Sequence, residues 1–362
     1  MVQPATVREP LKFKPILQAR IWGGDGLHRL LGKGPAESRD IGESWELSDR
    51  EGNASVAASG SFSGRDLREL FAGHARDILG DQYSPTLSRF PLLYKFIQAR
   101  ENLSVQVHPG EGSPLGEAKT ECWYILDAPP GGELILGLAG KGTREETLAA
   151  LAGKDCLSVL NRIPVHAGDL FFIPAGTVHA ITAGLLLYEV QQNSDATFRL
   201  YDWDRRDASG KSRPLHLQES AQVIDFRRHD RHRVPPLGIS LPTHREDFLT
   251  ACRHFALVKY TGVKEEIPLA GRYRFRVLTC VQGGFEIAWP GGVMPLDLGE
   301  TVLLPAACPD ARLREIRPHS QAIVSFLPLL DEEIIMPLRQ AGHSDRDISA
   351  LGGIDGLPGL QA

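Results

Sequence analysis

The sequence predicts a mainly β protein, built as two related β domains with a few peripheral helices. Its 37 glycines and 25 prolines separate short apolar runs, which is typical of strands joined by tight turns. A spacing also recurs: G-x5-P-x-G-x2-H over residues 168–179 reappears as G-x5-P-x-A-x2-D over residues 299–310. The second copy lacks the histidine, so we expect only the first to have kept a metal-binding imidazole.

Length and composition narrow the class of protein. The 362 residues, 42% hydrophobic and 23% charged, suit a globular chain of two or three domains. A net charge of −5 argues against a nucleic-acid partner, and no apolar run is long enough to span a membrane. Five widely spaced cysteines without a CxxC motif, and a start without a signal-peptide core, favour the cytoplasm. Composition carries no signal for the oligomeric state.

The chain divides into four predicted segments. They are a first β domain at 11–205, a connector at 206–250, a second and degenerate β domain at 251–328, and a tail of unassigned role at 329–362.

Strands and helices of the first domain follow from periodicity and capping signals. Strands are expected at 13–24, 41–48, 103–108, 122–126, 133–137, 168–173, 184–190 and 191–201, and residues 91–97 are an apolar segment that leads into the strand at 103–108. Ser63 precedes Asp66 in a capping pattern, and apolar residues from Leu67 to Leu79 repeat at helical spacing until Gly80, which predicts a helix here. The capping box from Thr143 to Glu146 predicts another.

Fewer elements are expected in the remaining segments. The connector contains a predicted helix at 217–226, and the tail contains one at 344–351. Strands of the second domain are expected at 255–259, 274–281, 284–289, 300–304 and 322–327.

The alternating run at residues 103–108 concentrates polar side chains on one face. Residues two apart in a strand point the same way, so Ser104, Gln106 and His108 share a face opposite three apolar neighbours.

A second strand at 122–126 follows, with Lys119 and Glu121 at its entrance. An antiparallel pairing of the two strands would bring these residues close to Gln106 and His108. An imidazole beside a carboxylate suits a divalent metal. The alternative interpretation is a polar loop with one satisfied histidine.

Residues 168–179 form a strand, a tight turn and a histidine. Pro174 stiffens the turn, Gly176 relieves it, and His179 is carried inward. The spacing resembles the second sequence motif of the cupin superfamily, in which this histidine binds a metal inside a small β-barrel.

A combination of motifs is more specific. Over residues 11–328 the chain closely resembles type I mannose-6-phosphate isomerase. The matching stretches are LSVQVHP at 103–109, KTE at 119–121, PAGTVHA at 174–180 and 189–199. IWGG at 21–24, GESWE at 42–46 and YDWDR at 201–205 resemble the short bacterial form, which lacks the long helical insertion of larger members.

The resemblance implies two cupin-type jelly-roll barrels and a zinc enzyme with one ion per chain. Its implied activity interconverts mannose 6-phosphate and fructose 6-phosphate. The family's metal ligands carry over onto Gln106, His108, Glu121 and His179.

The resemblance also implies residues that contact the substrate. Lys119, Glu189 and Arg199 match substrate-facing polar positions, and Ser104 and Arg205 match positions at the phosphate end of the sugar.

Aldose–ketose isomerisation moves a proton between C1 and C2 through a cis-enediol, and needs a base and a stabilised enediolate. Glu189, among apolar strand neighbours, is expected to have a raised pKa and to transfer the proton. Lys119 would stabilise charge or shuttle a proton, and Arg199 would hold an oxyanion or phosphate. The alternatives are a strand-end glutamate paired with arginine and a surface lysine.

Two other functions fit the same residues. An iron-dependent cupin oxygenase would usually contain more histidines than His108 and His179. A non-catalytic cupin that binds sugar phosphate would keep the pocket without turnover, although intact Glu121, Glu189 and Lys119 argue against that loss.

Overall fold

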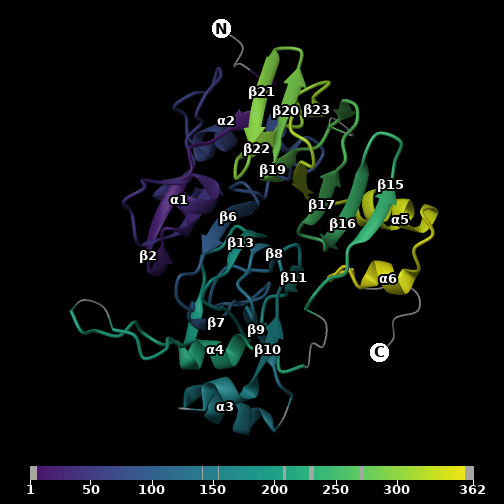
Figure 1. The fold of residues 1–362 in the computed structure, drawn as a ribbon. Helices are drawn as coiled ribbons and strands as arrows, with labels where there is room; N and C mark the ends of the chain where they lie inside the picture. The colour runs from purple at the N-terminus through teal and green to yellow at the C-terminus, as the bar shows by residue number, and fades with distance from the viewer. Residues whose placement is uncertain are drawn as a thin grey trace. The chain divides into compact units, whose positions relative to one another are not determined.

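A computed structural model describes residues 6–140, 142–153, 155–206, 209–227, 232–269 and 273–354 (Figure 1). The chain divides into two compact units. We call residues 17–44 and 93–233 the central unit, and residues 1–16, 45–92 and 234–362 the terminal unit. This division cuts the chain differently from the four predicted segments, because residues 45–92 group with the C-terminal half. The predicted boundaries stay a prediction.

Two sheets form the central unit. The six-stranded sheet, in the order β11-β8-β13-β6-β3-β2, consists of β2 (Ile16–Gly24), β3 (Ile41–Leu47), β6 (Leu92–Gln98), β8 (Glu121–Asp127), β11 (Leu170–Ile173) and β13 (Leu186–Gln192). The five-stranded sheet, in the order β10-β9-β12-β7-β14, consists of β7 (Val105–Val107), β9 (Glu133–Leu138), β10 (Leu160–Pro164), β12 (His179–Ile181) and β14 (Phe198–Tyr201). Every strand pair of the five-stranded sheet is antiparallel.

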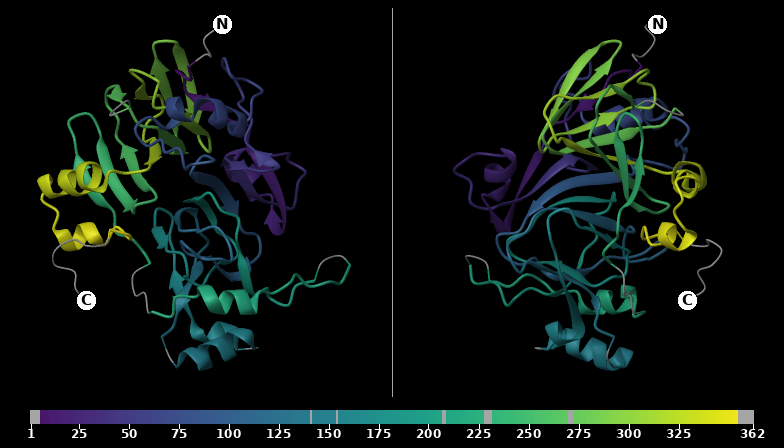
Figure 2. Two further views of the ribbon diagram at one scale, coloured as in Figure 1. Left: turned by 180° about the vertical axis from the view of Figure 1, so that it is seen from behind. Right: turned by 45° about the vertical axis from the view of Figure 1, so that its right-hand side comes forward.

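Alternation along the strands gives the five-stranded sheet two apolar faces. Leu134, Leu136 and Ile181 belong to a buried cluster that also contains Trp123 and Leu187 of the six-stranded sheet, so this cluster joins the two sheets. The other face packs against α3 (Arg144–Ala152), η1 (Cys156–Val159) and α4 (Leu217–Val223). Figures 1 and 2 show α3 and α4 on the same side of this unit. We call the face toward the six-stranded sheet the inner face.

Local sequence signals located the helices well. The predicted capping box is present at α3: Glu146 N donates to Thr143 Oγ1 at 3.2 Å and Thr143 N donates to Glu146 Oε2 at 2.7 Å. α2 (Leu67–Leu79) starts after Asp66, whose side chain accepts from Glu69 N at 2.8 Å, so the cap is Asp66 and not Ser63. One further short helix, α1 (Gly26–Leu31), lies in the central unit.

The terminal unit also contains two larger sheets. The seven-stranded sheet consists of β1 (Leu11–Lys12), β22 (Thr301–Leu304), β19 (Arg276–Gln282), β24 (Gln321–Phe326), β17 (Ala256–Thr261), β16 (Arg245–Ala251) and β15 (Leu237–Ser240). The four-stranded sheet consists of β18 (Ile267–Pro268), β23 (Arg312–Glu315), β20 (Gly284–Trp289) and β21 (Gly292–Asp297), and β4 (Asp49–Arg50) pairs with β5 (Asn53–Ala54). The mainly β class is therefore confirmed.

Two stretches contain more structure than we expected. β15 and β16 lie within the predicted connector, whose first part supplies α4. The predicted tail contains a π-helix (Leu330–Ile335), α5 (Met336–Gln340) and α6 (Asp345–Ser349), and α6 starts after the expected Ser344 cap. Among the helices that the structure describes, none has the length and apolarity needed to cross a membrane.

Candidate metal centre

A row of polar side chains crosses the inner face of the five-stranded sheet. His179 of β12 pairs with Gln106 of β7, and Gln106 pairs in turn with Arg199 of β14. Side chains directly opposite each other in antiparallel strands share a face. His179 also pairs with Leu136, whose side chain belongs to the cluster between the two sheets. The row therefore points toward the six-stranded sheet.

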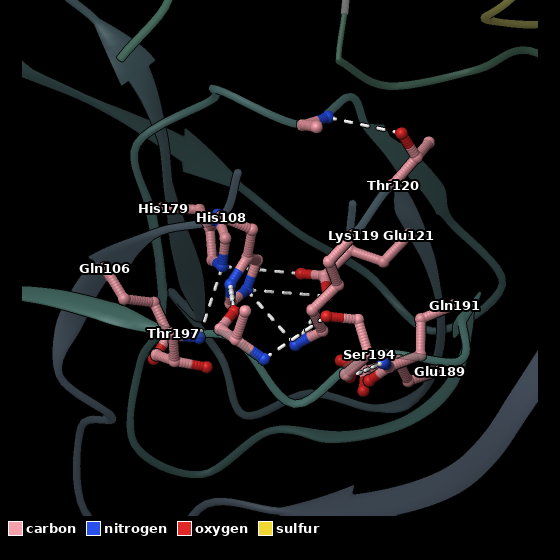
Figure 3. A network of polar contacts seen from close by, with 12 residues as sticks. Gln106, His108, Lys119, Thr120, Glu121, His179, Glu189, Gln191, Ser194 and Thr197 are labelled. Carbon is pink, nitrogen blue, oxygen red and sulfur yellow. Dashed lines mark hydrogen bonds and ion pairs between the residues drawn. The ribbon is translucent and has the colours of Figure 1, made fainter. Parts of the chain in front are cut away.

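Glu121 approaches this row from the six-stranded sheet. It is the first residue of β8, while His108 directly follows β7. His179 Nε2 lies 3.3 Å from Glu121 Oε1, and His108 Nε2 lies 3.7 Å from Glu121 Oε2. The potential ligand atoms of all three lie within 4.8 Å of one another. Figure 3 shows these side chains and Lys119 turned toward one another.

The expected pairing of the strands that contain Gln106 and Glu121 is wrong. β7 pairs with β12 and β14, whereas Glu121 of β8 pairs with Ile173 and Gln191 in the other sheet. The loop at 108–120 is long enough to cross from one sheet to the other, so it joins them instead of closing a hairpin. The predicted convergence nevertheless occurs, because both strands present these residues to the space between the sheets.

Hydrogen bonds orient both histidines. Nδ1 of His108 lies 2.7 Å from the carbonyl oxygen of Ala196, and Nδ1 of His179 lies 2.9 Å from that of Thr177. Because a carbonyl only accepts, each Nδ1 carries the proton and each Nε2 carries a lone pair. The lone pair of His108 accepts from Lys119 Nζ at 3.1 Å, and that of His179 accepts from Gln106 Nε2 at 3.2 Å. Those lone pairs face the cluster, the arrangement found when histidine binds a metal.

Burial sets the charge of these side chains. It lowers the pKa of His179 to about 3 and, together with the neighbouring Lys119 ammonium, holds the pKa of His108 well below its usual range. Burial also raises the pKa of Glu121 to about 7, although Lys119 Nζ lies 3.1 Å from Oε2. Apart from that ion pair, neither oxygen of Glu121 has a hydrogen-bond partner among the described residues. Two neutral imidazoles beside a buried carboxylate fit a divalent cation.

Gln106 lies beside this cluster. Its Nε2 is 3.2 Å from His179 Nε2, and its Oε1 accepts a hydrogen bond from Ser104 Oγ at 3.3 Å. A rotation of the amide would turn Oε1 toward the cluster, because the two ends of an amide have the same shape. Ser104 and Gln106 thus lie on one face, as the alternation predicts.

Glu189 lies in a buried network with Lys95 and Trp123. Lys95 Nζ is 2.9 Å from Glu189 Oε1, and Trp123 Nε1 donates to Oε2 at 2.9 Å. Burial raises the pKa of Glu189, but the positive charges of Lys95 and Lys119 lower it by more. The net result is a pKa below the usual value. The expected raised pKa is therefore wrong, because a lysine ion pair is buried beside the carboxylate. Glu189 is ionised, and both of its oxygens have partners.

Sequence reasoning missed Lys95. It lies in the run LLYKFIQ of β6, which we interpreted as an apolar segment, and its Nζ also donates to Gln191 Oε1 at 2.7 Å. The available signal was a single lysine within an otherwise apolar strand, since a buried lysine needs a partner.

Replacing Lys95 with methionine would leave Glu189 as an uncompensated buried charge. We expect the free energy of unfolding to fall by about 3–5 kcal/mol, which denaturant titration measures. The double variant Lys95→Met/Glu189→Gln removes both charges and should recover most of that loss. A loss below about 1 kcal/mol in the single variant would contradict the buried ion pair.

The remaining predicted site residues lie at the β14 end of the row. Arg205 Nη2 donates to Asp202 Oδ1 at 2.6 Å, and Arg205 Nη1 lies 4.0 Å from Glu101 Oε2. Arg199 is half-buried, and its Nη1 donates to Pro214 O at 3.0 Å. The structure thus gathers His108, Glu121, His179, Lys119 and Gln106 in one group. Arg199 of β14 and Arg205, which follows that strand, lie in a second group.

The chain is similar in sequence to known mannose-6-phosphate isomerases. Residues 11–138 match the family described as "Phosphomannose isomerase type I, catalytic domain". The chain is 37% identical over 333 residues to a mannose-6-phosphate isomerase of Bacillus subtilis, which covers 88% of this chain and 99% of that protein. It is 42% identical over 220 residues to a mannose-6-phosphate isomerase of Streptococcus mutans, which covers 60% of this chain and 68% of that protein.

A solved structure is similar as well. The crystal structure of the mannose 6-phosphate isomerase from Bacillus subtilis superposes with a TM-score of 0.78 at 30% identity. The superposition covers 87% of this chain and 99% of that chain.

Proposed function

Because the chain belongs to the type I phosphomannose isomerase family, we propose that it interconverts mannose 6-phosphate and fructose 6-phosphate, with one zinc ion per chain. The observation that carries the proposal is the buried cluster of His108, Glu121 and His179. The row from His179 to Arg199 supports a substrate that has a metal-facing end and an anionic end.

His108 Nε2, His179 Nε2 and a Glu121 oxygen would hold the metal, with Gln106 as a fourth ligand after rotation of its amide. Two imidazoles, one amide oxygen and one carboxylate would suit zinc and leave the site with positive charge. When bound, zinc supplies Lewis acidity toward hydroxyl and carbonyl oxygens.

The surrounding side chains would handle the proton and the developing charge. Lys119 Nζ lies 3.1 Å from His108 Nε2 and 3.1 Å from Glu121 Oε2, so a cation stands beside the cluster where enediolate charge would develop. Glu189 is our proposed proton acceptor: it is ionised, and the Lys95 ion pair that lowers its pKa weakens it as a base only while that pair is closed. It accepts a substrate proton once one oxygen is released from Lys95 or Trp123.

Arg199, Arg205 and Ser104 are the proposed contacts for the anionic end of the sugar. His179 and Arg199 are separated by two strand spacings, about 10 Å between backbones, which is the scale of an extended hexose phosphate. An arginine fork matches phosphate geometry.

The proposal places the protein in the cytoplasm. All five cysteines are buried and outside any disulfide, and burial raises the pKa of Cys156 to about 11. Buried thiols of this kind suit a reducing compartment.

A coupled assay tests the function. The purified protein should produce fructose 6-phosphate from mannose 6-phosphate and run the reaction in reverse, with little turnover of unphosphorylated mannose. Absence of turnover in the presence of zinc, together with binding of the sugar phosphate, would favour the non-catalytic alternative. Iron as the activating metal would contradict the assignment of zinc.

A further inference from the structure

We propose that Arg213 is a positioning residue of the phosphate site: its two-pronged ion pair with Asp202 leaves donors of Arg205 and Arg199 available to the phosphate group of the substrate. The inference deepens the proposed function and rests on it. Arg213 lies in the predicted connector, and neither the motifs nor the resemblance marked it.

Asp202 is shared between two arginines. Arg213 Nε donates to Asp202 Oδ2 at 2.7 Å and Arg213 Nη2 donates to Oδ1 at 2.5 Å, while Arg205 reaches only Oδ1, at 2.6 Å. Asp202 is 6% exposed, so water competes little for these bonds. Because a carboxylate offers one edge to a two-pronged guanidinium, a second arginine on the same carboxylate binds only through a remaining lone pair. Arg213 therefore restricts Arg205 to a single bond.

Unused donors remain on the other two arginines. Arg199 Nε, Arg205 Nε and Arg205 Nη1 are buried and have no hydrogen-bond partner, and Glu101 at 4.0 Å is beyond hydrogen-bond distance of Arg205 Nη1. Leaving a buried charged donor without an acceptor costs free energy. An anion with several acceptor oxygens would satisfy such donors, and phosphate has the geometry for guanidinium groups.

The charge balance favours an anion as well. Three guanidinium groups, those of Arg199, Arg205 and Arg213, face one buried carboxylate, that of Asp202. Burial lowers the pKa of Arg199, and repulsion from Arg213 and Arg205 lowers it too. Among the described residues, the second acid paired with Arg205 is Glu101, whose side chain is 49% exposed. A doubly charged phosphate ester would neutralise the excess.

Hydrogen bonds of the residues that follow Arg213 hold this segment beside Arg199. The segment that follows it runs along β14, the edge strand of its sheet. His216 N donates to Arg199 O at 2.7 Å, Arg199 N lies 3.1 Å from His216 Nδ1, and Arg199 Nη1 donates to Pro214 O at 3.0 Å. The same segment thus anchors both Arg213 and Arg199, and Arg199 stands one strand away from Gln106. This anchoring links the arginine group to the metal-facing end of the row.

Loss of Arg213 would free Asp202 Oδ2 to take a second bond from Arg205 and would remove one positive charge. We expect Arg213→Ala to raise KM for mannose 6-phosphate by about 10- to 100-fold, the worth of one or two charge-assisted hydrogen bonds, with kcat within a few-fold of the parent. Inhibition by inorganic phosphate should weaken by a similar factor. Arg213→Lys keeps the charge without the fork and should lie between the two.

Arg206→Ala is the matched control. Arg206 is exposed, its Nη1 donates to Gly210 O at 2.9 Å, and the variant removes one arginine from the same segment. Its KM and phosphate inhibition should stay near those of the parent. Zinc content and thermal unfolding midpoints identify any variant that has lost its fold. If Arg213→Ala does not fold, the KM and phosphate inhibition of Arg213→Lys test the role of Arg213.

Calorimetric binding of inorganic phosphate separates this inference from the proposed function. A parent protein that binds phosphate but does not turn over mannose 6-phosphate would overturn the function and leave the anion site standing. KM and phosphate affinity within twofold of the parent in both Arg213 variants, or a parent that does not bind phosphate, would overturn the role of Arg213.

Discussion

Replacing His108 or His179 with alanine is expected to remove the bound metal and the isomerase activity together. Each ring presents Nε2 to the cluster while a carbonyl oxygen holds Nδ1. Nε2 is therefore the nitrogen of each ring that can bind the metal. Lewis acidity is worth several kcal/mol, and its loss should lower kcat/KM by about 10³-fold or more. Elemental analysis and the coupled assay on the same preparation measure both losses.

His166→Ala is the control for this pair. His166 is a histidine of the same unit, and its side chain is 77% exposed. It should keep both zinc and activity. Full zinc stoichiometry in His108→Ala and His179→Ala would contradict the ligand assignment.

Glu189→Gln is expected to keep the metal and lose turnover. Loss of the carboxylate leaves Lys95 as a buried cation without its counter-ion, so the free energy of unfolding should fall by about 3–5 kcal/mol. The amide is nearly isosteric with the carboxylate and can still accept from Trp123, so the geometry of the site should be kept in the folded protein. It cannot accept a proton, and loss of a general base usually costs about 10²- to 10⁴-fold in kcat. Steady-state kinetics and zinc content in one preparation measure the two properties.

Glu133→Gln is the control for Glu189→Gln. Glu133 pairs with Arg162 at 3.1 Å, and both side chains are more than one-third exposed. The variant should behave like the parent. A near-normal rate in Glu189→Gln would remove this residue from the mechanism and direct attention to Lys119.

Local patterns predicted the side-chain directions but not the sheet to which each strand belongs. Alternation correctly placed Gln106 on the face opposite Val105 and Val107, which pack in the outer cluster. The same pattern could not show that β7 and β8 join different sheets, because that choice depends on pairing with β12, β14, β11 and β13, which are remote in the chain.

The sequence also did not predict which charged residues contact one another in the folded chain. The sequence marked Glu189, but its low pKa depends on Lys95, which lies more than ninety residues earlier. Arg213 was hidden for a similar reason, since a polar connector gives no hint that its backbone runs along β14. Such contacts follow from the fold rather than from spacing.

The matched zinc and activity titration of the parent protein tests the central claim most directly. A chelator should remove one zinc per chain and abolish conversion of mannose 6-phosphate in proportion, and added zinc should restore both. Unchanged turnover in a protein shown to be free of metal would contradict a catalytic cation held by His108, Glu121 and His179.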